Sequence, residues 1–173
     1  EGKEYYAATE GKISYSEKDH QLSITPIYII EGNVDNATGD IHFNGDVLVK
    51  GNVFANTTIR ATGNITVNGH VEIANLYAGK NVILKNGMQG SGTGTINAKG
   101  QVMAKFLEQT VVTAGGDVSA NALLNCNIES GAEIIVSGNR GSIIGGSTKA
   151  VEKITASSLG NRVGVKTKLI VGF

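Results

Sequence analysis

The sequence lacks several features that would point to common protein classes. It contains no tryptophan, aromatic residues make up 5% of the chain, and 15 Lys and Arg balance 15 Asp and Glu. A neutral chain with few aromatic rings does not favour nucleic acid as a partner, because that binding depends on basic surfaces and stacking platforms. No apolar run reaches the roughly 18 residues of a membrane-spanning helix, so we expect no membrane insertion.

Cysteine and proline are also scarce. The single cysteine, Cys126, cannot form an internal disulfide, which favours a reducing compartment such as the cytoplasm. It has no neighbouring base in the sequence, and we interpret it as a small structural residue. The chain begins at Glu1 rather than Met, which we interpret as the start of a fragment.

Glycine, in contrast, is abundant, and several glycines mark a repeat. The 24 glycines are roughly twice average usage, and a branched aliphatic residue recurs at every sixth position between residues 41 and 71. The pattern returns further along the chain, less regularly. The predicted core anchors are Ile41, Val47, Val53, Ile59, Ile65, Val71, Val82, Ile96, Val102, Val118 and Ile134. Short strands separated by glycine turns predict a chain that turns a corner every six residues and stacks on itself.

The predicted fold class is therefore all-β, a single-stranded parallel β-helix (solenoid) with about 18 residues per coil and about six or seven coils. Turn pairs precede most anchors. The predicted structural corners are Gly39, Asp40, Gly45, Asp46, Gly51, Asn52, Gly63, Asn64 and Gly69. Asn and Asp suit corners because they adopt left-handed backbone conformations and bond to nearby amides. Stacking at this interval places Phe43 near Ala61 and Asp46 over Asn64.

Residues 1–31 differ from the repeat and are predicted to form an N-terminal β cap. Two alternating runs, Lys12–Tyr15 and Gln21–Ile24, flank a turn at Glu17–His20. A cap is expected because an open solenoid end exposes unpaired strand edges and apolar side chains. We therefore divide the chain into the cap, residues 1–31, and the parallel β-helix, residues 32–173.

Candidate catalytic and metal-binding side chains are dispersed. Some hexapeptide solenoids are acyltransferases with a histidine base, but His20, His42 and His70 have no triad-like or metal-like neighbours in the sequence. The carboxylates that could form a calcium or acid–base cluster occur singly, and an 18-residue coil stacks no two of them: Asp35, Asp40, Asp46, Glu72, Asp117 and Glu133. We predict no catalytic, cofactor-binding or metal-binding residues and no cofactor. A solenoid enzyme acting on carbohydrate or acyl groups is the alternative.

Two glycine-rich regions are interpreted as a loop and as corners of the coil. Gly87–Gly94 lacks the Gly-Lys-Ser/Thr ending of a phosphate loop and is interpreted as a side loop. Gly138–Gly141 and Gly145-Gly146 are interpreted as tight corners. Arg140, within the first of these corners, is a candidate for binding a carboxylate of a partner.

Several distinct motifs occur in a fixed order along residues 28–173: Gly39–Val47, Gly69–Ala74, Ala104–Glu108, Gly116–Val118, Arg140–Gly146, Leu159-Gly160 and Thr167–Gly172. Together they resemble the β-solenoid domain of flagellar assembly protein A, a bacterial family. The Gly-Asp-Val repeat alone is shared with bactofilins.

The resemblance implies a right-handed parallel β-helix from a bacterial cytoplasmic protein without known catalytic activity. It also implies protein partners, among them flagellar, polar or phosphotransfer regulatory components, and self-association. It supplies no catalytic residues. We therefore expect a non-enzymatic scaffold or protein-interaction domain linked to flagellar assembly or polar placement, with a bactofilin-like filament former as a further alternative.

Overall fold

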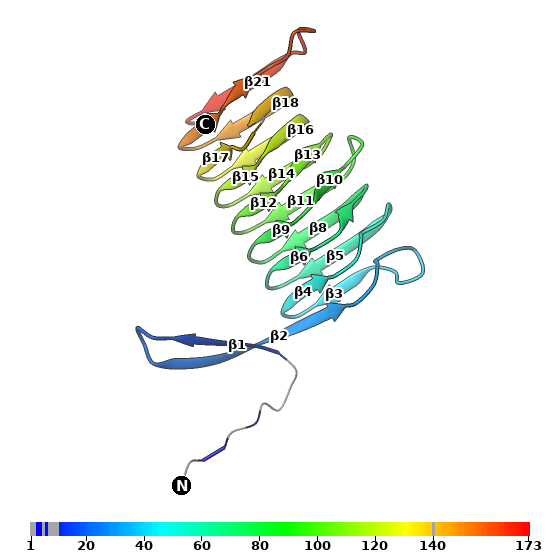
Figure 1. Cartoon of the computed structure of the whole chain (residues 1–173), viewed down its shortest axis with the longest axis vertical. Helices are drawn as coiled ribbons and strands as arrows, with labels where there is room; N and C mark the ends of the chain where they lie inside the picture. The colour runs from blue at the N-terminus through cyan, green and yellow to red at the C-terminus, as the bar shows by residue number, and fades with distance from the viewer. Residues whose placement is uncertain (1–2, 5, 7–10, 140) are drawn as a thin grey trace.

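The computed structural model describes residues 3–4, 6, 11–139 and 141–173. Within these residues the chain forms only strands, turns and connecting segments, arranged as a stack of parallel coils (Figure 1). The predicted all-β solenoid is confirmed. The stack has about eight turns rather than six or seven, because a strand of the N-terminal hairpin begins it and the C-terminal segment completes it. Right-handedness stays a prediction.

Each coil contributes to three faces, which we name after their first short strands. The β4 face is one sheet of parallel strands, preceded by the antiparallel β1 (Gly11–Ser16). Its strands are β2 (Gln21–Ile30), β4 (Asp46–Val49), β6 (Ile65–Val67), β9 (Val82–Leu84), β12 (Val102–Ala104), β15 (Val118–Ala120), β17 (Glu133–Val136) and β19 (Lys153–Ala156).

The other two faces share a twelve-stranded sheet. The β3 face contains β3 (Ile41–Phe43), β5 (Thr57–Ala61), β8 (Ala74–Ala78), β11 (Thr95–Ala98), β14 (Val111–Ala114) and β21 (Thr167–Val171). The β7 face contains β7 (His70–Val71), β10 (Gly87–Gln89), β13 (Phe106–Glu108) and β20 (Ser158–Leu159). Two long strands, β16 (Ala122–Ser130) and β18 (Ser142–Ala150), run around the corner and join the two faces.

The coils differ in length. At the corners, backbone amides donate hydrogen bonds to side-chain oxygens of the preceding coil. In successive parts of the stack, the two residues joined in this way are 18, 17, 20 and 16 positions apart. The 20-residue coil includes the turn at Ser91–Thr93, where the chain makes an additional loop before β11. A constant repeat of 18 residues therefore describes only the coil in which residues 41–53 pair with residues 59–71, and register must be followed strand by strand.

The core is a narrow tube of inward side chains. All eleven residues that we expected as core anchors are buried, with exposed fractions between 0% and 7%. Large residues lie over small ones in places: Phe43 pairs with Ala61, while Val49 pairs with Val67. Burial of each aliphatic side chain contributes roughly 1.5–3 kcal/mol, so the stacked interior drives folding.

The corners are fastened by side chains that reach the next coil. Asp46 Oδ1 accepts a hydrogen bond from the amide of Asn64, and Asn52 Oδ1 accepts one from the amide of His70, both at 2.8 Å. The nine expected corner residues lie between strands, apart from Asp46, which begins β4. Gly63 fits against Asp46 only because it lacks a Cβ, which would lie 2.1 Å from Asp46 Oδ1. Tight corners thus require both the acceptor and the glycine.

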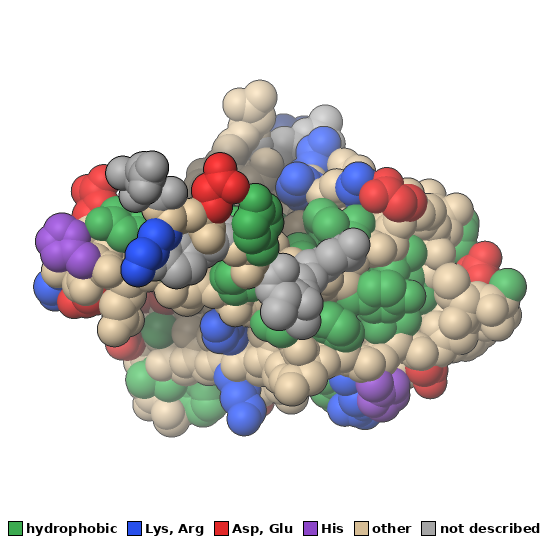
Figure 2. Space-filling view, turned by 90° about the horizontal axis from the view of Figure 1, so that it is seen from below, with side chains coloured by type: hydrophobic (Ala, Val, Ile, Leu, Met, Phe, Trp, Pro, Cys, Tyr) green, Lys and Arg blue, Asp and Glu red, His purple; other side chains and the backbone are tan. Residues whose placement is uncertain are grey.

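The two ends of the stack differ. At the N-terminal end, β1 pairs antiparallel with the first part of β2, and Ile27–Ile30 of β2 pair in parallel with β4. The turn of this hairpin projects beyond the side of the stack (Figure 1), and at this end hydrophobic side chains are exposed among charged ones of both signs (Figure 2). At the C-terminal end, β19 and β21 are edge strands. The division of the chain at residues 31 and 32 stays a prediction.

Candidate partner-binding groove

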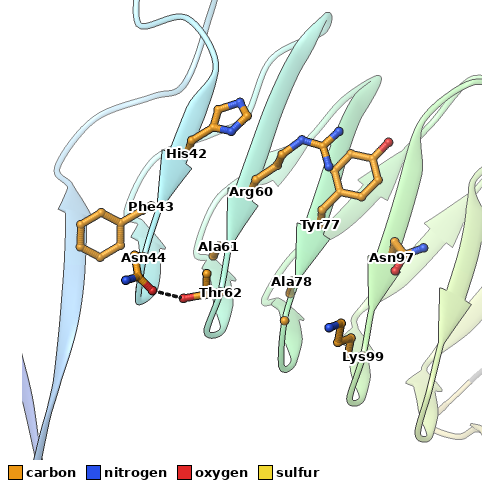
Figure 3. A pocket seen from close by; sticks show the side chains of 11 residues that line it. His42, Phe43, Asn44, Arg60, Ala61, Thr62, Tyr77, Ala78, Asn97 and Lys99 are labelled. Carbon is orange, nitrogen blue, oxygen red and sulfur yellow. Dashed lines mark hydrogen bonds between the residues drawn. The ribbon is translucent and has the colours of Figure 1, made fainter.

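A groove of about 620 Å³ lies on the β3 face, across β3, β5, β8 and β11 (Figure 3). It forms where the outward position between Thr62 and Lys99 is occupied by Gly79, which has no side chain. Gly79 is required by the backbone, because a Cβ there would lie 2.2 Å from the carbonyl oxygen of Thr62. The groove is thus a consequence of tight coil stacking.

One row of outward side chains crosses the groove in register: His42 beside Arg60, Arg60 beside Tyr77, and Tyr77 beside Asn97. The Arg60 guanidinium carbon lies 3.8 Å from the centre of the Tyr77 ring, a cation–π contact (Figure 3). Such contacts contribute about 0.5–1 kcal/mol at exposed sites and restrict the guanidinium to one plane. Arg60 is therefore held above the face with its N–H groups available.

The groove has a floor of strand backbone and a basic rim. Its floor is the backbone of β5 and β8 at Ala61 and Ala78, whose side chains point into the tube, while Arg60 and Lys99 stand at its rim. The ion pairs of the described part of the chain are Lys50–Glu31 and Lys149–Glu129, so neither rim cation belongs to one. The arrangement suits an anionic group.

The three histidines lie in three separate places. His20 ends the hairpin turn, with its Nδ1 3.1 Å from the Tyr15 hydroxyl. His70 begins β7 and stacks on the Phe106 ring at 5.8 Å between centroids. His42 is exposed at the edge of the groove beside Arg60. None is hydrogen-bonded to a carboxylate within the described residues, so a triad is not assembled there.

The carboxylates serve mainly as backbone acceptors. Asp40 Oδ1 accepts a hydrogen bond from the amide of Thr58 at 2.8 Å. Asp35 Oδ1 accepts bonds from the amides of Thr38 and Ala37, which hold the pKa of this carboxyl below its usual range. Glu72 accepts a bond from the amide of Ala55. These bonds fix turns and corners.

The expectation that no two of these carboxylates stack is wrong for one pair. Asp117 and Glu133 lie in adjacent coils, because the residues that follow them, Val118 and Ile134, pair between β15 and β17. The amide of Glu133 donates a hydrogen bond to Asp117 Oδ1 at 3.1 Å. The cause is a coil of 16 residues where the prediction assumed 18. The pair is nevertheless a corner contact, because no third ligand joins it: no group of three or more His, Cys, Asp or Glu side chains suited to a metal occurs in the described residues.

Cys126 lies inside the tube, 1% exposed, where its thiol donates to the carbonyl oxygen of Leu107 at 3.2 Å. Burial raises the pKa of this thiol, which keeps it neutral and unreactive. Arg140, the candidate for a partner's carboxylate, lies outside the described residues.

The sequence did not reveal the groove. Its polar side chains come from four strands and the turns that follow them, and no local motif joins them. The glycine at position 79 and the lysine at position 99 were the available signals, but their proximity depends on the unequal coil lengths.

No helix in the described residues could cross a membrane.

No curated protein and no solved structure matches the chain. The family model that matches residues 26–173 is described as the Flagellar Assembly Protein A beta solenoid domain. It covers most of the chain, all three faces of the stack and every residue of the groove, and it confirms the resemblance that the ordered motifs indicated. The chain therefore belongs to the Flagellar Assembly Protein A beta solenoid family.

Proposed function

We propose that this chain is a non-enzymatic scaffold that binds other proteins during flagellar assembly or polar placement in the bacterial cytoplasm. The observation that carries the proposal is the membership of a rod of about eight stacked coils in a family named for flagellar assembly. Stacked coils with a continuous core make a stiff rod, and its flat faces offer side-chain rows for recognition. The mechanism is geometric: partners bind at fixed separations along one rod.

The partners that we propose are proteins: flagellar or polar components, or phosphotransfer regulatory proteins. Membrane insertion and nucleic-acid binding have no part in the proposal. The balanced charge of the chain supports this choice, because it provides no overall field that would attract polyanions.

The test is affinity capture of the full-length protein from its own host, with cross-linking and mass spectrometry, alongside deletion of its gene. We expect a flagellar, polar or phosphotransfer protein in the capture, and loss or misplacement of flagella that the wild-type gene restores. A strictly monomeric protein that captures no protein, in a strain whose motility survives deletion, would contradict the proposal.

The enzyme alternative has its own test. It requires a histidine base, and His42 and His70 are the histidines on the faces of the stack. The double variant His42→Ala, His70→Ala should restore motility to the deletion strain as well as the wild type does. Failure of this folded variant to restore motility, with partner capture intact, would favour catalysis.

A filament-forming role is a second candidate, because one observation favours it. At the C-terminal end, inward positions of the last coil remain exposed: Leu159 by 57%, Leu169 by 37% and Val171 by 52%. Such a surface, beside the edge strands β19 and β21, favours self-association. Electron microscopy of the purified protein would reveal filaments, and a homogeneous monomer at high concentration would exclude them.

A further inference from the structure

We propose that the groove on the β3 face binds an acidic, extended segment of a protein partner. Carboxylates of the segment would accept hydrogen bonds from Arg60 and Lys99, while its backbone lies across β8 between these two cations. This inference rests on the proposed function as a protein-binding scaffold. It adds the site and the chemistry of the partner.

The first observation is that Arg60 is oriented by a neighbouring ring and has no ion-pair partner among the described residues. The contact with the Tyr77 ring at 3.8 Å orients the guanidinium plane, and no carboxylate of the described residues pairs with it. Planar guanidinium groups bind carboxylates through two parallel hydrogen bonds, about twice as strong as bonds between neutral groups. A fixed and unpaired arginine is therefore suited to a carboxylate supplied by another molecule.

The second observation is a contrast within the same row of side chains. Further along the β3 face, Glu129 and Lys149 occupy the corresponding outward positions and pair with each other at 2.6 Å. At the groove the row contains Arg60 without such a neutralising partner, and the unpaired Lys99 stands nearby. Asp40, which precedes β3, is already bonded to the amide of Thr58. Positive charge is thus concentrated at the groove in a chain that is neutral as a whole.

The third observation is the shape of the site. Arg60 and Lys99 stand on different coils, and the space between them lies over the backbone of the coil that contains Gly79. Two coil steps of about 4.8 Å place their backbones roughly 10 Å apart along the rod. Side chains on one face of an extended chain recur every second residue, so carboxylates two or four residues apart span roughly 7 or 13 Å, and the long Arg60 and Lys99 side chains cover the difference. An extended segment can therefore reach both cations.

Nucleic acid fits the groove less well. Single strands bind along continuous basic tracks with open aromatic faces on which bases stack. Here Arg60 already covers the Tyr77 ring, and the row continues through Asn97 and Thr113 to Glu129. The basic surface is short and ends at a carboxylate.

The test begins with selection of a random 12-residue peptide library on the wild-type protein. We expect recovered peptides to be enriched in Asp and Glu. Their affinity, measured by fluorescence anisotropy, should fall at least about tenfold for the double variant Arg60→Gln, Lys99→Gln, because bonds to charged groups are lost. Arg60→Lys should give an intermediate loss, since it keeps the charge and loses the planar fork.

The control is a matched pair on the β4 face, Lys85→Gln with Lys105→Gln, which removes the same charge from positions away from the groove. This variant should keep the affinity. Circular dichroism melts must show that both double variants are folded, as expected for side chains outside the core.

Three outcomes would overturn the inference: no recovered peptides, peptides without acidic enrichment, or acidic peptides that bind the groove variant unchanged. Binding of a 20-nucleotide single-stranded DNA in place of peptides, lost in the same variant, would assign the groove to nucleic acid and overturn it too. Capture from the host separates the two proposals. Partners retained by the groove variant contradict only the groove, whereas absence of any partner with wild type contradicts the scaffold.

Discussion

A middle coil and the last coil of the stack place leucines in equivalent inward positions, but the two leucines differ in how much of the side chain is exposed. Leu76 on β8 and Leu169 on β21 belong to one inward row, which runs through paired residues of β11, β14, β16 and β18. Leu76 is fully buried, whereas Leu169 is 37% exposed. The difference is that Leu76 has a coil on both sides and Leu169 has one. Burial in this fold is therefore supplied by neighbouring coils rather than by the coil itself.

The largest expected effect is the difference in the free energy of unfolding between alanine variants of these two leucines. Leu76→Ala should lower the free energy of unfolding by about 2–5 kcal/mol, because a cavity replaces a filled position in the tube. Leu169→Ala should cost less, about 1–1.5 kcal/mol, since part of its side chain is already in water and its loss encloses no cavity. Urea denaturation followed by circular dichroism measures both.

Equal losses at the two positions would break the comparison. They would indicate that the last coil is covered in solution, as a second copy of the chain would cover it. Repeating the Leu169→Ala measurement across a range of protein concentrations distinguishes this case, because stability from association rises with concentration.

The sequence predicted the regular early repeat better than the later coils of unequal length. In the first coils, aliphatic residues at every sixth position and the Gly-Asp and Gly-Asn pairs give the strands and corners directly: Ile41, Val47, Ile59 and Ile65 all lie in short parallel strands. There, Ile41 pairs with Ile59 and Val47 with Ile65, both 18 residues apart, so the six-residue pattern and the three-dimensional neighbours agree.

The groove could not be predicted in this way. A constant repeat of 18 residues places Arg60 over position 78, but its neighbour is Tyr77, because this coil is one residue shorter. The next coil is longer, so Tyr77 pairs with Asn97. The cation–π contact and the position of Lys99 depend on these two shifts. The same kind of shift stacked Asp117 and Glu133. Coil length depends on how each turn packs on its neighbours, which a single sequence does not state.

The second prediction compares two glycines near the N-terminal end of the stack. Gly63→Ala should cost about 1–3 kcal/mol, because the new Cβ would meet Asp46 Oδ1 and the carbonyl oxygen of Gly45 inside a tight corner. Gly32→Ala should change stability by less than about 0.5 kcal/mol, since nothing lies within 4 Å of a Cβ there. Chemical denaturation of the two variants is the measurement.

A similar loss at both glycines would mean that the backbone freedom of glycine, rather than contact with the preceding coil, sets the requirement. The double variant Gly63→Ala, Asp46→Ala tests the contact itself. Removing the carboxylate relieves the clash with Oδ1 but also removes the bond to Asn64, so the two effects should not add.

The smallest expected effect concerns Cys126, which tests whether the later, irregular coils are as closed as the first ones. Its thiol has a raised pKa in the folded protein because it is buried. The contribution of this thiol to stability is therefore fully present below the pKa of the unfolded chain, roughly 8.5, and is lost as pH rises from there through the folded value. Between pH 7 and pH 9.5, the wild type should lose more stability than Cys126→Ala, in which this group is absent. The native thiol should also react with a disulfide reagent far more slowly than the unfolded chain does. Equal slopes together with rapid labelling would mean that this interior opens readily, and that the coils of unequal length are packed less firmly than the regular ones.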